Sequence, residues 1–281
     1  MRAYCDLHTH SVYSDGTCTP KELIDQAEEL GLAAIALTDH NTVSGLPEFL
    51  AAAEGKQVEA VPGIEFSTDW GGGELHILAL FVKPEHYGTI EDLLAQAKQR
   101  KEESNIALIR ALAKDGYEID YEKIKASTPN GQVNRALIAA ELTDQGYTES
   151  IQHAFKTLLS EKHGYFKPPK RLDALQVIPF IKSIGAAAVL AHPWLNLDEK
   201  TLPEFLEKAV DAGLDGMETL YPLFDEELTR AAAEIARRYG LCPSGGSDYH
   251  GSNKPHIRLG TGKGDLRVPG AVLSGLQEKC M

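Results

Sequence analysis

The sequence predicts an α/β protein whose parallel strands close into a barrel, with a block of helices inserted into it. About seven apolar segments of strand length alternate with helical segments, which is typical of a parallel sheet. Histidines and acidic residues stand at or just past the ends of most of these strands. A closed barrel gathers the carboxyl ends of its strands on one face. An open doubly wound sheet would gather such residues at a single switch point, so their spread over six strands favours the barrel.

The first part of the chain has clear start and stop signals for its elements. Thr19 suits the N-cap of a helix, Pro20 its first position, and Glu22 completes a capping box. Gly31 suits the end of that helix. Residues 70–73, which include three glycines, form a turn between two strands. The other elements expected here are strands at 3–8, 33–37, 58–64 and 75–81, and a helix at 47–54.

The middle of the chain has a different pattern, because no strand-like segment lies between about Lys98 and Lys167. Helical segments at 90–114, 121–125, 135–145 and 149–159 occupy it, and Lys167-Pro168-Pro169-Lys170 closes it. We therefore expect a barrel domain formed by residues 1–97 and 168–281, and an all-helical insertion or lid at 98–167. Alternation then resumes, with strands expected at 186–191, 216–220 and 241–244 and helices at 174–184, 203–212 and 225–239.

Composition and charge exclude several classes of protein. No apolar run approaches the roughly 20 residues that span a membrane, and the N-terminus lacks the apolar segment of a signal peptide. We expect a cytoplasmic protein without a membrane partner. The formal charge of −13 argues against an extended nucleic-acid surface. Segment 98–171 is nevertheless mildly basic, with 13 Lys and Arg against 10 Asp and Glu. It either helps to hold an anionic substrate or carries ordinary solvated helix charges.

Four short stretches rich in histidine and acid carry the chemistry. Residues two apart on a strand share a face, so His8 and His10 can point the same way, and Asp248 and His250 repeat this spacing. One such pair is weak evidence for a metal site, but two pairs with further ligands at strand ends are strong evidence. Mixed histidine and carboxylate ligands suit Mn, Fe or Zn. The stretches are 6–11 with Asp15, 38–41, 191–193 and 247–251, and Glu65 and His76 are expected at the same site.

These motifs, in this order, resemble those of the PHP (polymerase and histidinol phosphatase) superfamily over nearly the whole chain. The helical insertion, with Asn134-Arg135-Ala136 and Ala154-Phe155, is similar to the subgroup of small phosphoesterases that includes nucleoside 3',5'-bisphosphate phosphatases and 5'-to-3' exonucleases of short RNA. The resemblance implies a distorted (β/α)7 TIM-like barrel with a site for three divalent metal ions, Mn being favoured and Fe or Zn being alternatives.

The resemblance also implies how the ligands divide among the ions. Each of the three metals would have its own group of ligands, and Glu65 would bridge the first and the second metal. No ligand that the family pattern calls for is missing. The implied groups are His8, His10 and Asp248 for the first ion, His76 and His192 for the second, and Asp15, His40 and His250 for the third.

Adjacent divalent metals lower the pKa of bound water and hold the attacking and leaving oxygens of a phosphate ester. We therefore expect a metal-activated hydroxide to attack the phosphorus of a phosphate ester. The resemblance implies that the substrates are small nucleotides of the nucleoside 3',5'-bisphosphate type or short 5'-phosphorylated oligonucleotides. Asp15 and His192 are the candidates for protonating the leaving oxygen. Glu218 lies in the middle of a strand, and we expect it inside the barrel or behind the ligands rather than on a metal.

Arg135 is the first candidate for a second phosphate contact, because a planar guanidinium suits bidentate phosphate binding. A surface salt bridge is the competing interpretation, and Lys167 and Arg258 are weaker candidates. Two other functions stay open. One is a histidinol-phosphate-type phosphatase that acts on a small non-nucleotide monoester, for which the insertion would be surplus. The other is a non-catalytic metal-binding module, against which the intact ligand set argues.

Overall fold

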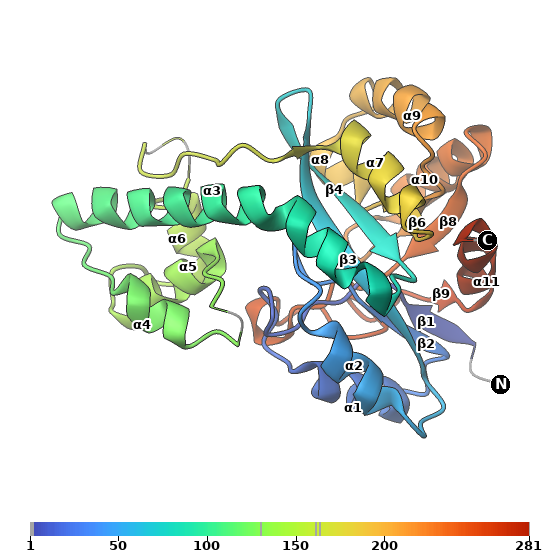
Figure 1. Ribbon diagram of the computed structural model, residues 1–281, viewed down its shortest axis with the longest axis horizontal. Coiled ribbons are helices and arrows are strands. Elements are labelled where there is room, and N and C mark those ends of the chain that lie inside the picture. Colours follow the sequence, from blue (N-terminus) through green and yellow to red (C-terminus); the bar gives the residue numbers. More distant parts are fainter. Residues whose placement is uncertain (1–2, 130, 161, 163, 281) are drawn as a thin grey trace.

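The computed structural model describes residues 3–129, 131–160, 162 and 164–280, and its centre is a barrel-shaped sheet (Figure 1). The strand order is β8-β7-β6-β4-β3-β2-β1-β9, and β5 pairs with β3 beside this path. The strands are β1 Tyr4–Asp6, β2 Ala34–Leu37, β3 Glu59–Trp70, β4 Gly73–Leu80, β5 Leu172–Asp173, β6 Ala187–Leu190, β7 Gly216–Leu220, β8 Cys242–Gly245 and β9 Val268–Pro269.

Backbone hydrogen bonds between the first and the last ligand-bearing segments close the sheet on itself. The amide of Leu7 donates to the carbonyl of Gly245 at 3.2 Å, and the amide of Asp248 donates to the carbonyl of His8 at 2.8 Å. Thr9 and Tyr249 form a parallel bridge just beyond. The barrel is therefore closed at the end where the segments with the predicted ligands lie, which is called the upper rim below. The predicted fold class, a distorted TIM-like α/β barrel with a helical insertion, is confirmed.

Two strands, β4 and β9, run against the others, which corrects the expectation of a parallel sheet; β9 is antiparallel to β1. β4 is antiparallel to both β3 and β6. Gly71 and Gly72 form the two-residue loop between Trp70 and Gly73, and both have positive φ, 64° and 83°. Such a loop permits only an antiparallel hairpin. β3 also continues to Trp70, so Glu65 lies in mid-strand and not at the strand end that the sequence suggested.

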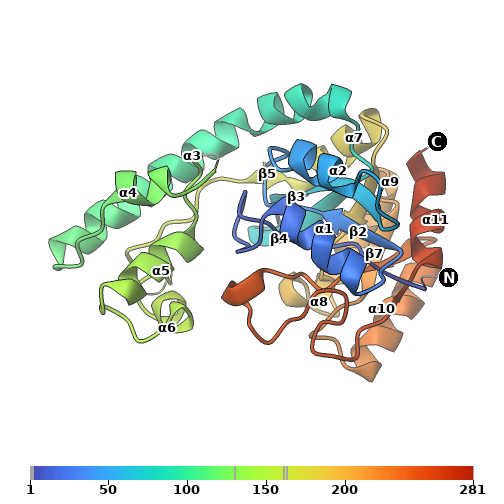
Figure 2. The same ribbon diagram turned by 90° about the horizontal axis from the view of Figure 1, so that it is seen from below.

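Helices surround the barrel, and four of them form the insertion. Long α3 extends from the barrel to the far end of the insertion, with α4, α5 and α6 packed along it (Figures 1 and 2). No helix of the described residues is long and apolar enough to cross a membrane. The helices are α1 Pro20–Glu29, α2 Leu46–Ala53, α3 Tyr87–Lys114, α4 Tyr121–Ala126, α5 Arg135–Asp144, α6 Ile151–Lys156, α7 Ala174–Ser183, α8 Pro193–Asn196, α9 Thr201–Asp211, α10 Glu226–Arg238 and α11 Ala271–Gln277.

The insertion has an apolar core of its own. Leu108 and Leu112 of α3 pack with Ile138 and Leu142 of α5 in a cluster separate from the barrel core. Among the described residues 98–167 there is no strand, as the sequence suggested. The insertion is tied to the barrel at its mouth, where the side-chain amide of Asn134 donates to the carbonyl of Ser14 at 2.6 Å. Whether segment 98–167 is an independent domain stays a prediction.

The capping box at the start of α1 is confirmed: Thr19 Oγ1 accepts from the amide of Glu22 at 3.2 Å, and Glu22 Oε2 accepts from the amide of Thr19 at 2.7 Å.

Successive side chains of a barrel strand point alternately into two different apolar cores. On β2, Ile35 and Leu37 belong to the core shared with the outer helices, whereas Ala34 and Ala36 belong to the core shared with α11.

α11 fills the end of the barrel opposite the ligands. A Cβ on Gly216, the first residue of β7, would lie 2.9 Å from Leu276 Cδ2, so this helix packs tightly on the strand starts. Leu273 and Leu276 are buried in the same apolar cluster as Cys5 and Ala187. Because this end is filled with apolar side chains, polar groups inside the barrel are confined to the other rim.

Barrel closure depends on the absence of a side chain at Gly246. A Cβ there would lie 2.4 Å from Cβ and 2.5 Å from N of His8, and backbone cannot yield as a flexible side chain does. We expect Gly246→Ala to lower the free energy of unfolding by about 1–3 kcal/mol, as overpacking does. The matched control is Gly275→Ala in α11, where the nearest atom is 4.0 Å away.

At Gly275, alanine should raise the free energy of unfolding by about 0.5–1 kcal/mol, because alanine favours a helix interior. Urea unfolding of the two variants, followed by circular dichroism, measures both changes. Equal stability of the Gly246→Ala variant and the parent protein would contradict this view of barrel closure.

Candidate metal centre

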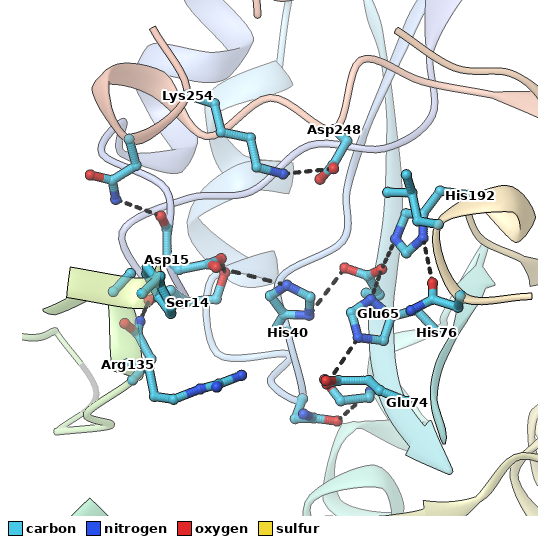
Figure 3. Close-up of a pocket in the computed structure, with 18 of the residues that line it drawn as sticks. Ser14, Asp15, His40, Glu65, Glu74, His76, Arg135, His192, Asp248 and Lys254 are labelled. Atoms are coloured by element: carbon cyan, nitrogen blue, oxygen red, sulfur yellow. Dashed lines mark hydrogen bonds and ion pairs between the residues drawn. The ribbon is translucent and has the colours of Figure 1, made fainter. Parts of the chain in front are cut away.

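The structure brings all nine predicted metal ligands together at one end of the barrel, the upper rim, and six of them line one cavity: Asp15, His40, Glu65, His76, His192 and Asp248 (Figure 3). They come from segments that are far apart in the sequence: the ends of β1, β2, β6 and β8, and the middle of β3 and β4. Three of the nine, Asp15, His40 and His76, are partly exposed and face the cavity. The six buried ligands are His8, His10, Glu65, His192, Asp248 and His250.

Glu65 stands at the centre of this group, and its side chain is only 1% exposed. Its two carboxylate oxygens face different sets of histidines, an arrangement suited to a bridging ligand. Oε2 lies 3.3 Å from His8 Nε2, 3.2 Å from His10 Nε2 and 3.1 Å from His40 Nδ1, whereas Oε1 lies 2.8 Å from His76 Nδ1 and 3.1 Å from His192 Nε2.

The other two predicted carboxylate ligands, Asp248 and Asp15, lie beside further histidines of the same group. Asp248 Oδ1 lies 3.3 Å from His10 Nε2 and 3.7 Å from His8 Nε2. Asp15 Oδ1 lies 3.3 Å from His250 Nε2, and Asp15 Oδ2 lies 3.8 Å from His40 Nε2. Every predicted ligand therefore has a donor atom within 3.8 Å of a donor atom of another.

The donor atoms have the spacing and the unmet bonding capacity expected of a metal centre. Ligand bonds of about 2.1 Å place neighbouring donors roughly 3.0–3.4 Å apart, close to the distances seen around Glu65. Three of these atoms, Glu65 Oε2, His40 Nδ1 and His76 Nδ1, are buried without a hydrogen-bond partner. Buried polar atoms normally have partners, so divalent cations fit here.

Three overlapping sets of ligands have donor atoms within 4.8 Å of one another. Each set contains a histidine that also belongs to another set, so the cations would lie side by side in one cluster. The sets are His10, Asp15, His40 and His250; His8, His10 and Glu65; and His40, Glu65 and His76.

The electrostatics of the site keep its carboxylates ionised. Burial alone would raise the pKa of Glu65, but its interactions with the imidazoles of His40, His76 and His8 outweigh burial and hold this pKa well below its usual value. Burial lowers the pKa of His40 to about 3, because it disfavours the charged imidazole. Burial also opposes charge on His76, but the Glu65 carboxylate raises its pKa to about 10.

Two buried carboxylates outside the predicted ligand set hold in place the loops that carry it. Asp6 accepts hydrogen bonds from the amide of Ser247 at 2.8 Å, from its hydroxyl at 2.5 Å and from the amide of Gly260 at 2.7 Å. It thus ties the loop that carries Asp248 to the end of β1. Burial raises the pKa of Asp6, although these hydrogen bonds oppose the rise.

Asp39 performs the same task for the loop after β1. It accepts from the amide of Ser11 at 2.7 Å and from the hydroxyls of Ser11 at 2.6 Å and Ser14 at 2.5 Å. The loop that carries Asp15 is therefore fixed against the end of β2. The motif Thr38-Asp39-His40 contains one candidate ligand and one loop-holding residue, and only the structure separates the two.

Sequence reasoning missed two side chains that hold Asp248. Tyr221 donates from its hydroxyl to Asp248 Oδ2 at 2.6 Å. Lys254 Nζ donates to the same residue's Oδ2 at 2.7 Å (Figure 3). With Oδ2 occupied in this way, Oδ1 is the oxygen that faces the histidines. Lys254 follows Asp248 by six residues in the same loop, so its position beside the motif was a usable signal. Tyr221 lies on a different segment and gave none.

The cavity in front of the ligands has a volume of about 700 Å³ and lies between the barrel and the insertion. Arg135 lines it, with its guanidinium 4.1 Å from the centre of the Phe166 ring. Lys101 of α3, which sequence reasoning did not single out, lines it too, and burial lowers its pKa. Lys167 and Arg258 are exposed and do not belong to the lining.

Comparison with known proteins agrees with this geometry. The model of the PHP domain family matches residues 6–166. The chain is 31% identical to the 5'-3' exoribonuclease Rnm of Salmonella typhimurium, over 91% of this chain and 87% of the relative. It is 30% identical to the 3',5'-nucleoside bisphosphate phosphatase of Chromobacterium violaceum, over 88% and 87%.

A solved structure from Bifidobacterium adolescentis, named as a metal-dependent phosphoesterase, superposes with a TM-score of 0.86 at 27% identity and covers 98% of this chain and 96% of that chain. The ligand cluster fits the divalent metals that such an enzyme needs. The chain belongs to the PHP domain family, and it is a metal-dependent phosphoesterase, a hydrolase.

Proposed function

We propose that the enzyme hydrolyses a phosphate ester of a small nucleotide that carries a second phosphate, or of a short 5'-phosphorylated oligonucleotide. The observation that supports this proposal most is the placement of charge around the cavity. The metal ligands form one wall, and Arg135 and Lys101 of the insertion also line it. A substrate held at the metals by one phosphate can thus present a second anion to the insertion.

The size of the cavity supports the same substrate class. Small-molecule sites in proteins range from about 300 to 1,000 Å³, and about 700 Å³ suits a nucleotide rather than a bare phosphate. The relatives named above include a nucleoside bisphosphate phosphatase and an exoribonuclease. Lys167 and Arg258 lie outside the lining, so a contact with either would require a substrate that extends beyond the cavity.

We propose three divalent ions, Mn being favoured over Fe or Zn, because mixed histidine and carboxylate ligands suit these metals. Bound metals would neutralise the phosphoryl oxygens and activate water. We propose for the ions the ligand groups that the family pattern implies, with Glu65 shared between two of them. Asp15 and His192 both line the cavity, and we keep them as candidates for moving a proton to the leaving oxygen.

For His192, the surroundings fix the nitrogen that faces the ligands. Its Nδ1 lies 3.1 Å from Asn196 Oδ1, which only accepts, so Nδ1 carries the proton. Its Nε2, 3.1 Å from Glu65 Oε1, then has the lone pair. This arrangement favours a metal-ligand role for His192.

A histidinol-phosphate-type phosphatase is the second candidate, and an assay separates the two. Adenosine 3',5'-bisphosphate, histidinol phosphate and a short 5'-phosphorylated RNA are each incubated with the Mn-loaded enzyme, and released phosphate or nucleotide is measured. We expect kcat/KM to be highest for the bisphosphate or the RNA. A higher kcat/KM for histidinol phosphate would contradict the proposed substrate class.

Removal of metal should abolish activity without unfolding the protein. After dialysis against a chelator, with metal content checked by elemental analysis, hydrolysis should be lost and should return on addition of Mn. Ligand binding to the native state raises thermal stability, so the melting temperature should rise with Mn concentration. Full activity in protein shown to be metal-free would contradict the proposed chemistry.

Arg135 should matter only for substrates with a second anion. A hydrogen bond to a charged group contributes about 1.5–3 kcal/mol, so Arg135→Gln should raise KM for adenosine 3',5'-bisphosphate by roughly tenfold or more. The KM for p-nitrophenyl phosphate, which has no second phosphate, should change little. Arg110→Gln is the matched control, because Arg110 is an exposed residue of α3 outside the cavity lining. Equal effects of Arg135→Gln on both substrates would contradict a second phosphate contact.

A further inference from the structure

We propose that Glu218 is a positioning residue that prepares two metal ligands, His8 and His192, for the ions. Glu218 lies in the middle of β7 and is 0% exposed. It does not line the cavity, so it has no route to the substrate. Its two carboxylate oxygens contact the two ligands separately. The inference rests on the proposed metal centre, because its effect is exerted on metal binding.

The first contact fixes the tautomer of His8. Glu218 Oε1 lies 3.0 Å from His8 Nδ1. An ionised carboxylate can only accept, so Nδ1 carries the proton and donates it. The lone pair of His8 is then at Nε2, which lies 3.3 Å from Glu65 Oε2 and 3.1 Å from His10 Nε2. A carboxylate behind a histidine generally orients the ring for a metal and makes its free nitrogen more basic.

The second contact holds the backbone at His192. The amide of His192 donates to Glu218 Oε2 at 2.7 Å. His192 has φ 26° and ψ 59°, in the left-handed region. A residue other than glycine is strained in such a conformation. A short hydrogen bond to a buried charge offsets part of that strain. It holds the turn from β6 into α8 in the shape that directs Nε2 toward Glu65.

The two positioned ligands have neighbouring rings, with centroids 5.7 Å apart, but they contact different oxygens of Glu65. His8 faces Glu65 Oε2, whereas His192 faces Glu65 Oε1. One buried carboxylate therefore sets ligands at both oxygens of the residue that we propose as the bridge. Glu74 beside His76 differs from it, because Glu74 has a single histidine contact, at 3.3 Å, and its side chain is 34% exposed. Loss of Glu218 should thus weaken more than one metal position.

Glu218→Gln tests the proposal with almost no change in shape. The amide of His192 requires an acceptor, so the side-chain oxygen of the glutamine takes that contact. Its NH₂ group then faces His8 Nδ1 and can only donate. The proton of His8 is thereby moved to Nε2, where the metal should bind. We expect the affinity for Mn, measured by isothermal titration calorimetry, to fall roughly 10- to 100-fold.

The control is Glu234→Gln. This substitution removes the same charge, but Glu234 is an exposed residue of α10 and does not contact the predicted ligands. Its Mn affinity should equal that of the parent protein. In Glu218→Gln, an excess of Mn should restore most of kcat, since Glu218 does not touch the substrate. Equal Mn affinity of Glu218→Gln and the parent protein would overturn the proposal. A parent protein that binds no Mn would overturn the proposed function itself.

A second measurement needs no variant and so does not depend on whether Glu218→Gln folds. Long-range ¹H–¹⁵N correlation spectra of the parent protein loaded with Zn, which is diamagnetic, report which nitrogen of each imidazole carries a proton. We expect the signals of His8 to show a protonated Nδ1 and a metal-bound Nε2. A metal-bound Nδ1 in His8 would refute the tautomer that Glu218 is proposed to fix.

Discussion

The structure depends on one buried carboxylate, Glu65, placed in the middle of a barrel rim. An isolated buried charge costs several kcal/mol unless it is compensated. Here five imidazoles surround the two oxygens, all within 3.3 Å. These imidazoles come from four separate segments of the chain, so the compensation of this one charge requires the folded sheet that brings these segments together. Several of these nitrogen and oxygen atoms lack hydrogen-bond partners, and this makes the site suitable for divalent cations.

Outside the ligands lies a further set of buried acids that fix their positions. Asp6 holds the loop after β8, Asp39 holds the loop after β1, and Glu218 contacts two ligands from behind. Rigid placement of ligands is costly in stability, because buried carboxylates lose their hydration. The cost is offset by hydrogen bonds from backbone amides and serine hydroxyls. The apolar end of the barrel, against which α11 packs, stabilises the fold at a distance from the candidate metal centre.

The barrel, the helical insertion and the ligand set could be predicted because each has a local signal. Strand and helix periods, the capping box at Thr19 and the histidine spacing are all properties of short stretches. The glycines after Trp70 are also a local signal for the reversed direction of β4. The regular alternation of strand-like and helical segments, however, favours a parallel sheet. Contacts across the fold had no such signal: Asp6 and Ser247 are 241 residues apart. The roles of Asp6 and Tyr221 depend on such contacts, so the sequence alone could not assign them, whereas the mid-strand position of Glu218 did predict a place behind the ligands.

The metal cluster itself is tested most directly by anomalous diffraction from crystals of the Mn-loaded enzyme, with data collected on both sides of the Mn absorption edge. Three peaks are expected among the nine ligands, with Glu65 in contact with two of them. Absence of any peak between Glu65 and its histidines in active, Mn-loaded protein would contradict the central claim that these side chains form one multi-metal site.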